Sequence, residues 1–395
     1  MDIKLSSRVQ RIKPSPTLAV TALAAQLRAQ GRDVIGLGAG EPDFHTPDPI
    51  KEAGIAAIRN NKTRYTAVDG TPGLKQAIID KFKRDNGHDF QPDQILVSCG
   101  GKQSFFNLAQ ALLNEGDEVI IPAPYWVSYP DMVLLADGKP VIVSADQSQG
   151  FKMTPEQLEA AITPRTRLVV INSPSNPTGV AYSREELAAL AEVLLRHPHV
   201  LVATDDMYEH MMFRGVPFVN ILMACPALYD RTIVLNGVSK AYAMTGWRIG
   251  YAGGPKALIS AMKKIQSQST SNPTSIAQEA AEAALNGDQG CVGEMCKAFE
   301  QRHDYLVAAL NAIPGVECLP SDGTFYSFPS VKGAMEKLGM DSDVKFSEYL
   351  LDKVGVALVP GSAFGADGHV RISFATSMDN LKQAVERIAR AVEGE

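Results

Sequence analysis

Short apolar runs rich in valine and isoleucine recur along residues 45–300, and stretches with helical periodicity separate them. The runs do not alternate apolar with polar residues, which is typical of strands that helices cover on both faces. This order of strands and helices predicts an α/β fold with a mostly parallel, doubly wound sheet. The seven expected strands are 95–98, 119–121, 141–143, 168–171, 200–203, 233–235 and 249–252.

Readable helix starts lie between several of these runs. Thr71 precedes a proline at the first position of one helix, and Thr154 with Gln157 and Ser183 with Glu186 form capping boxes for two others. Ligands of doubly wound sheets bind beyond the carboxyl ends of the strands. Functional residues are therefore expected directly after the apolar runs.

The pattern changes after a long amphipathic stretch at about 291–312. Short runs at 325–328, 356–359 and 370–374, with helices near 343–354 and 378–393, indicate a smaller α+β domain. We expect an N-terminal segment, 1–44, that joins this small domain, a large domain, 45–300, and the small C-terminal domain, 301–395.

Composition argues against several classes of protein. The net charge is -6 with no basic block, which gives nucleic-acid binding no support. No apolar run approaches the roughly 18 residues of a membrane span, and the N-terminus has no apolar signal region. The five cysteines are scattered without a CxxC pair. A cytoplasmic protein with free thiols and no metal site is expected.

The stretch Asn236–Tyr251, NGVSKAYAMTGWRIGY, places Lys240 and Arg248 between two apolar runs. Charged side chains are rarely buried without a partner. An anionic cofactor that carries an aldehyde would explain both residues, with the lysine as a Schiff-base amine and the arginine on a phosphate. The alternative is a pair of surface cations on a loop.

Three other strand ends carry candidate binding groups. The Gly100–Gly101 turn opens a helix, where backbone N–H groups attract an anion, although a tight turn needs the same residues. Trp126 follows 119–121 and is suited either to stacking on a planar ring or to core packing. Asn176 lies in a proline-locked loop that either presents its amide at fixed geometry or is a plain rigid turn.

Asp205 ends a buried run, where a carboxylate needs a partner such as a protonated ring nitrogen. Tyr208 follows, with a hydroxyl suited to a ring oxygen; the alternative is a helix N-cap at Asp205 or Asp206. Arg371 lies in an alternating strand, either clamping a carboxylate or exposed to solvent.

The segment GLGAG at 36–40 superficially resembles a dinucleotide fingerprint. Such a fingerprint must open a helix, whereas Glu41, Pro42 and Asp43 follow here at once. A glycine-lined strand end that lies close to a ligand fits the segment better.

Taken together and in this order, the motifs resemble the class I (fold type I) pyridoxal-phosphate aminotransferases over nearly the whole chain. Within them the chain is most similar to bacterial aspartate aminotransferases of the Iβ subgroup, some of which also transaminate prephenate. The matching segments are GEPDF (40–44), TRYTAVDGTPGLKQAI (63–78), GGKQ (100–103), PYWVSYP (124–130), NSPSNPTG (172–179), DDMYEH (205–210), SKAYAMTGWRIGY (239–251) and VRISFATS (370–377).

The resemblance implies pyridoxal 5′-phosphate as cofactor, bound by the large domain. Lys240 would form the Schiff base, Asp205 would pair with the pyridinium nitrogen, and Asn176 and Tyr208 would bind the 3′-oxygen. Trp126 would stack on the ring. Lys240, Asp205 and Tyr208 would be the catalytic residues.

The resemblance also implies a phosphate site and a dimer. Gly101 and Lys102 through their backbone, together with Ser239 and Arg248, would bind the phosphate. Tyr65 would reach the phosphate of a neighbouring subunit, so the protein would be a homodimer with active sites at its interface.

The substrate-binding residues implied in the same way are Gly40, Trp126, Asn176, Arg371, Lys13, Ser15 and Thr17. Gly40 and Arg371 would bind the α-carboxylate, and the N-terminal segment would serve the distal carboxylate, because no matching motif supplies the arginine that the best-known members use. A second departure is the threonine in GTFYSFP (323–329), where a small residue after the glycine is more usual.

The implied activity is amino transfer between aspartate and 2-oxoglutarate, with prephenate as a further candidate. The substrates would therefore be amino acids and 2-oxo acids. The alternatives are an aminotransferase for aromatic residues or alanine, a β-lyase on the same fold, and, with less support, a regulator built on an aminotransferase domain.

Overall fold

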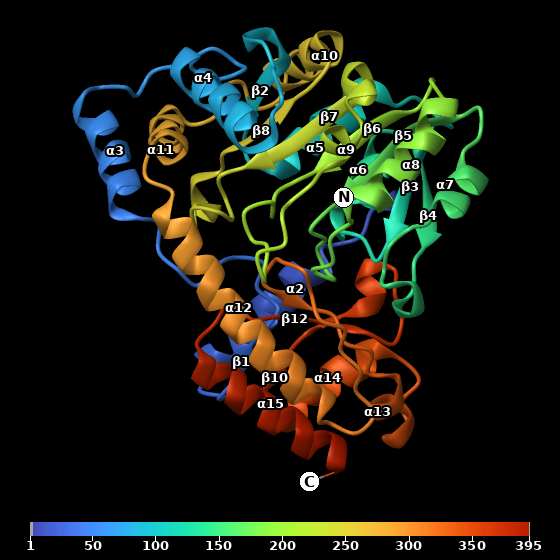
Figure 1. Cartoon of the computed structure of the whole chain (residues 1–395). Coiled ribbons are helices and arrows are strands. Elements are labelled where there is room, and N and C mark those ends of the chain that lie inside the picture. Colours follow the sequence, from blue (N-terminus) through green and yellow to red (C-terminus); the bar gives the residue numbers. More distant parts are fainter. Residues whose placement is uncertain (1–2, 395) are drawn as a thin grey trace.

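The computed structural model describes residues 3–394 and contains a seven-stranded sheet in the order β2-β8-β7-β6-β5-β3-β4 (Figure 1). Its strands are β2 (Ile95–Ser98), β3 (Glu118–Ala123), β4 (Lys139–Ser144), β5 (Thr166–Asn172), β6 (Leu201–Asp205), β7 (Thr232–Gly237) and β8 (Gly250–Gly253). All neighbours are parallel except β8, which runs antiparallel to both β2 and β7. The predicted mostly parallel, doubly wound sheet is confirmed.

Helices cover both faces of this sheet, and the period of two along each strand divides the side chains between them. In β3, Val119 and Ile121 pack with α5 (Gly101–Leu112), α6 (Ser128–Leu135) and α10 (Lys256–Ser267). Ile120 faces the other way, toward α7 (Pro155–Ala161), α8 (Arg184–Arg196) and α9 (Ile221–Ala224). Near β2 and β8, a third cluster contains α3 (Asp48–Arg59), α4 (Pro72–Lys81) and α11 (Ser275–Asn286).

The predicted helix starts form as expected. The Thr71 hydroxyl accepts a hydrogen bond from the Leu74 N–H, and both capping boxes, at Thr154 and Ser183, are complete. Each cap satisfies N–H groups that have no partner inside the helix. Local chemistry therefore fixes where these helices begin.

A second part of the molecule lies beyond α12 (Gly290–Asn311), the long orange helix of Figure 1. It contains an antiparallel sheet of β9 (Tyr326–Ser327), β11 (Val359–Pro360) and β12 (Val370–Ser373), with α13 (Lys332–Lys337), α14 (Asp343–Val354) and α15 (Met378–Glu393). β1 (Ile35–Gly36) pairs in parallel with β10 (Val356–Ala357), which ties the N-terminal segment to this part. The division at residues 44 and 300 stays a prediction.

The N-terminal segment contains a helix that the sequence pattern did not predict, α1 (Ser7–Arg11), before α2 (Pro16–Ala29). No residue of α1 is buried. A helix that packs no face against the core needs no apolar periodicity, so the sequence pattern did not indicate it. Arg8 and Arg11 instead form ion pairs with Asp137, at 3.0 and 2.6 Å. Among residues 3–394, no helix has the length and apolar character that crossing a bilayer requires.

Candidate active site

A cavity of about 420 Å³ lies at the carboxyl ends of the parallel strands, with walls from strand-end loops, α2, β9 and β12. It brings together side chains that are up to 356 positions apart in the sequence, from Ser15 to Arg371. The predicted site residues that line it are Ser15, Thr17, Gly40, Gly101, Lys102, Trp126, Asn176, Asp205, Tyr208, Ser239, Lys240, Arg248 and Arg371.

Lys240 lies in the loop between β7 and β8, and its Nζ donates a hydrogen bond to the Gly40 carbonyl oxygen. Burial is the main cause that lowers the pKa of Lys240 to about 8. Glu41 opposes this shift, whereas the positive charges of Arg371 and Arg248 add to it. An amine with this pKa is partly neutral near pH 7 and can therefore act as a nucleophile or a base.

Asp205 ends β6 with its carboxylate in the cavity. The Tyr129 hydroxyl and the Met207 N–H donate hydrogen bonds to it, and Asn172 Nδ2 donates to its backbone carbonyl at 3.0 Å. Burial raises the pKa of Asp205 despite the first two bonds. Because both donors are neutral, a cationic ligand group would find an unneutralised carboxylate here.

Close backbone contacts form an anion-binding corner beside α5. A Cβ atom at Gly100 would lie 2.2 Å from Arg248 Nη2, and one at Gly250 would lie 2.3 Å from the Gly101 nitrogen. At Gly250 only glycine lets the two backbone segments approach this closely, and the left-handed φ of 83° favours glycine at Gly100. The arginine donates to two backbone carbonyl oxygens. Ser239 is buried and lines the same cavity, as do Gly101 and Lys102 at the positive end of α5.

Trp126 forms one wall of the cavity. Its ring packs edge to face on Tyr129 at 5.1 Å, and Lys102 Nζ lies 5.2 Å from its centre. Burial lowers the pKa of Lys102, and the nearby charge of Arg248 lowers it further. The indole therefore offers a fixed flat surface inside a cationic region.

Arg371 is 2% exposed and faces the cavity rather than solvent. Its Nη1 donates to Asn176 Oδ1 at 2.9 Å and its Nη2 to the Gly38 carbonyl at 2.7 Å. Its Nε has no hydrogen-bond partner among the described residues. Uncharged acceptors compensate a buried guanidinium poorly, so a carboxylate ligand would be favoured here.

Two predicted residues do not line the cavity. Lys13 is exposed and lies near Asp131; burial raises the pKa of Asp131, and Lys13 opposes part of this rise. Tyr65 is 94% exposed, so its own protomer gives its side chain no site. Ser15 and Thr17 do line the cavity, and Thr17 Oγ1 is buried without a partner among residues 3–394.

Tyr129 and Tyr326, both fully buried, were not predicted from the sequence as site residues. Tyr129 lies in the first turn of α6, and its position in the segment PYWVSYP, three residues after Trp126, was the one signal that could have marked it. Tyr326 lies in a run that indicated a core strand, so no local pattern marked it. Its hydroxyl lies 3.0 Å from that of Tyr208.

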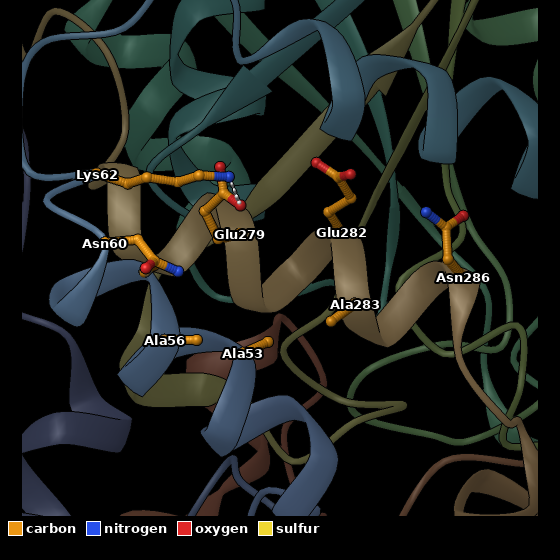
Figure 2. Close-up of a pocket in the computed structure, with 9 residues that line it drawn as sticks. Ala53, Ala56, Asn60, Lys62, Glu279, Glu282, Ala283 and Asn286 are labelled. Carbon is orange, nitrogen blue, oxygen red and sulfur yellow. Dashed lines mark hydrogen bonds and ion pairs between the residues drawn. The ribbon is translucent and has the colours of Figure 1, made fainter.

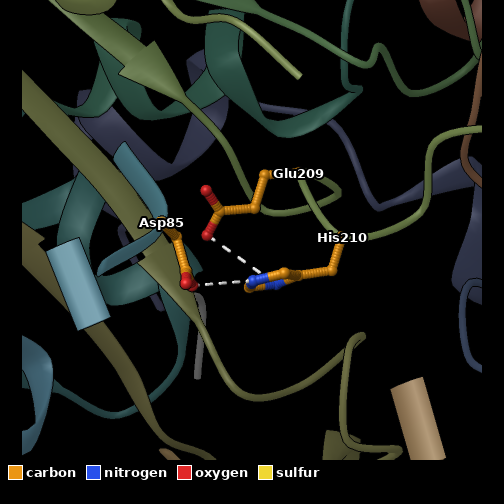
Figure 3. A group of neighbouring side chains, drawn as sticks. All are labelled: Asp85, Glu209 and His210. Atoms are coloured by element: carbon orange, nitrogen blue, oxygen red, sulfur yellow. Dashed lines mark hydrogen bonds and ion pairs between the residues drawn. The ribbon is translucent and has the colours of Figure 1, made fainter. Parts of the chain in front are cut away.

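Two other places offer weaker sites. A cavity of about 350 Å³ lies between α3 and α11. Several alanines line it, and Lys62 is paired with Glu279 at 2.7 Å (Figure 2). Figure 3 shows Asp85, Glu209 and His210, which together have metal-ligating atoms. The buried ammonium of Lys81 pairs with Glu209 there, so this cluster already contains a cation.

Known proteins resemble this chain over nearly its whole length. The family described as aminotransferase class I and II matches residues 32–388. An aspartate/prephenate aminotransferase of Nitrosomonas europaea is 64% identical over 393 residues, covering 98% of this chain and 99% of that protein.

Solved structures agree as well. The aspartate aminotransferase of Rhizobium meliloti is 51% identical with a TM-score of 0.96 and covers 99% of both chains. That of Thermus thermophilus, solved with maleate, is 44% identical with a TM-score of 0.93, covering 98% of this chain and all of that one. From its fold, its site and these likenesses, the chain belongs to the class I and II aminotransferases.

Proposed function

We propose that the protein is a pyridoxal-phosphate aminotransferase that moves an amino group between aspartate and 2-oxoglutarate and also accepts prephenate. The observation that carries this proposal is the arrangement of Lys240, Arg248 and Arg371 around Asp205 in one cavity. The printed names of full-length relatives at 52–64% identity, aspartate or aspartate/prephenate aminotransferase, support the same substrates.

The side chains fit the proposed cofactor group by group. The aldehyde matches the Lys240 amine, the ring nitrogen matches the Asp205 carboxylate, and the phosphate matches Arg248 beside the N-terminus of α5. The Tyr208 hydroxyl, whose pKa burial raises well above its ordinary value, stays protonated and able to donate to a ring oxygen. When bound, pyridoxal phosphate serves as the electron sink for the amino transfer.

The protein residues would then supply charge, orientation and proton transfer. Asp205 would stabilise a positive charge on the ring nitrogen, and Trp126 would hold the ring plane. The Lys240 amine, whose pKa burial lowers to about 8, would be the group that accepts and holds the proton of the substrate Cα. Arg371 would fix the α-carboxylate with parallel hydrogen bonds and so orient the Cα–H bond.

A second carboxylate on the substrate fits the remaining polar wall. Ser15 and Thr17 bring hydroxyls from the start of α2, and Lys102 adds a cation on the same cavity. A dicarboxylic substrate such as aspartate has one charge for Arg371 and one for this wall. Maleate, named with the Thermus thermophilus relative, is also a four-carbon dicarboxylate.

We also propose that the working protein is a homodimer in which Tyr65 serves the partner subunit's phosphate site. The 94% exposure of its side chain supports a role outside its own protomer. The cytoplasmic location stays a prediction.

A panel of amino acids tests the proposal. Purified protein with added pyridoxal phosphate is expected to gain a visible absorbance band that borohydride bleaches, and the Lys240→Ala variant is expected to remain colourless. Without an oxo acid, aspartate should convert the band faster than alanine or tyrosine. Wild-type protein that never takes up the cofactor would overturn the proposal, and ammonia release from substrates with a β-leaving group would indicate a lyase.

A further inference from the structure

Tyr326, at the start of β9, is a buried cavity residue to which no role has been given above. Its ring centre lies 4.4 Å from Arg371 Cζ, and its hydroxyl lies 3.0 Å from the Tyr208 hydroxyl. One side chain therefore contacts both the guanidinium at the proposed carboxylate site and the hydroxyl at the proposed cofactor site.

The ring of Tyr326 helps to fix the plane of the guanidinium. Phe364 lies on Arg371 as well, with its ring centre 5.1 Å from Cζ. Aromatic faces attract a cation, and they do so more strongly where water is excluded. The edge of the guanidinium remains available for hydrogen bonds, including the Nε that has no partner within the described chain.

The hydroxyl of Tyr326 lies against the segment that contacts Lys240. A Cβ atom at Gly40 would lie 3.2 Å from this hydroxyl, and the Gly40 carbonyl accepts the hydrogen bond from Lys240 Nζ. Burial raises the pKa of Tyr326, so the hydroxyl is protonated and able to donate. Donation to the Tyr208 oxygen would leave the Tyr208 proton directed to the cavity and strengthen that donor.

Thr324 positions the backbone of Tyr326. It adopts a left-handed φ of 69°, which is uncommon for a β-branched residue and costs conformational energy. Its Oγ1 accepts a hydrogen bond from the Tyr326 N–H at 3.1 Å, and its own N–H donates to the Met211 carbonyl at 2.9 Å. The unusual threonine of the GTFYSFP motif thus supplies an acceptor that alanine or glycine lacks.

We propose that Tyr326 is a positioning residue that couples the two ends of the site, holding Arg371 with its ring and Tyr208 with its hydroxyl, and that the Thr324 hydroxyl sets its backbone. This inference rests on the proposed function. It predicts that the ring and the hydroxyl affect different measurements.

The hydroxyl is tested with Tyr326→Phe, which keeps the ring. If Tyr208 is a weaker donor, the negative charge on the cofactor's ring oxygen is less stabilised. The adjacent Schiff-base nitrogen then loses its proton less readily. The midpoint pH of the cofactor's visible absorbance change should therefore rise by about half a unit, as expected for the loss of one hydrogen bond. The KM for aspartate should change less than about threefold, because the ring still contacts Arg371.

The ring is tested with Tyr326→Leu, compared with Tyr326→Phe. Loss of the aromatic face frees the guanidinium, so the KM for aspartate should rise about tenfold above that of the phenylalanine variant. The kcat should fall less than the KM rises. Equal KM values for the two variants would overturn the role of the ring.

Tyr182→Phe is the matched control, because Tyr182 is a partly buried tyrosine that does not line this cavity, and its hydroxyl accepts a hydrogen bond from the Met153 N–H. It should leave both measurements unchanged. Thr324→Ser keeps the acceptor and should behave as wild type, whereas Thr324→Ala should raise the midpoint pH and the KM. If wild type binds the cofactor and transaminates while the Tyr326 variants match Tyr182→Phe, this inference fails and the proposed function stands.

Discussion

At the scale of single residues, the site depends on charges that the protein leaves without opposite partners. Among residues 3–394, Arg371 donates only to an amide oxygen and a backbone carbonyl oxygen, and Asp205 accepts only from a hydroxyl and an N–H group. Burial makes such groups costly until a ligand supplies the missing charge. A cofactor and a substrate that carry complementary charges would therefore stabilise the folded protein as they bind.

The pKa of Lys240 leads to a kinetic prediction. Only the neutral amine attacks an aldehyde, so uptake of pyridoxal phosphate by cofactor-free protein should accelerate with pH and level off above about 8. Burial favours the neutral form of Lys240, so the amine loses its proton at a pH below the ordinary lysine pKa of 10.5. Rapid-mixing absorbance measurements across pH 6–10 check this prediction.

Glu41→Gln is the companion variant for this measurement. The Glu41 charge raises the pKa of Lys240, so its removal should move the midpoint to lower pH. A wild-type midpoint near 10.5, or a shift to higher pH in the variant, would contradict the electrostatic account.

Single site residues could be predicted from the sequence where they differ in character from their sequence neighbours. Lys240 and Arg248 could be singled out because they lie between two apolar runs, and Asp205 because it ends one. Tyr326 could not be singled out, because a tyrosine within an aromatic run has the same pattern as a core residue. Its partner Arg371 lies 45 positions later in the sequence, and only the fold brings the two side chains together. Roles that depend on a distant partner need the tertiary structure.

At the scale of elements, a buried polar network joins the two strands that position the site. Glu209, in the turn after β6, accepts hydrogen bonds from Asn236 at the end of β7, at 2.6 Å, and from Asn86, at 2.8 Å. Lys81, at the end of α4, pairs with the same carboxylate and donates to Asn86 at 2.8 Å. The network thus ties the turn that follows Asp205 to the strand that leads to Lys240.

We expect Lys81→Met to destabilise the protein by about 3–5 kcal/mol, because it leaves the Glu209 carboxylate buried without its cation. The paired variant Lys81→Met with Glu209→Gln should recover part of this loss. Urea unfolding of the cofactor-loaded proteins measures both. The exposed pair Lys345–Asp341 gives the control, since Lys345→Met should cost less than about 1 kcal/mol. Equal losses in the two lysine variants would contradict this account.

Element-scale prediction worked where one strand or helix determines its own pattern. The seven strands and three helix caps were predicted within a few residues because burial and capping are local. The position of β8 between β2 and β7, antiparallel to both, was not predicted, since register and order depend on partners. For the same reason, α1 and the Lys81–Glu209 ion pair were not predicted: both depend on partners distant in the sequence, and the two residues of the pair are 128 positions apart.

At the scale of the whole molecule, the chain folds the N-terminal segment back onto its C-terminal part. β1 pairs with β10, and α2 then brings Ser15 and Thr17 to the cavity that Arg371 borders from β12. The site is therefore formed by three distant regions of the sequence. Tyr65 remains outside it, exposed on the segment after α3.

Mixed dimers test whether Tyr65 serves the partner subunit. In a heterodimer of a Lys240→Ala chain and a Tyr65→Ala chain, the second chain keeps its lysine and receives an intact tyrosine from the first. One of two sites is then complete, so about half the wild-type activity is expected, measured after purification through two different tags. Each homodimeric variant should show far less.

The control places both substitutions in one chain and pairs it with wild type. The wild-type chain then keeps Lys240 but receives no tyrosine, so this heterodimer should have only the activity of a Tyr65→Ala site. If Tyr65 acted within its own protomer, the two heterodimers would exchange their activities, because the second would then contain the complete site. The comparison uses the same substitutions in both proteins, so it separates the subunit that Tyr65 serves from any effect on folding or association.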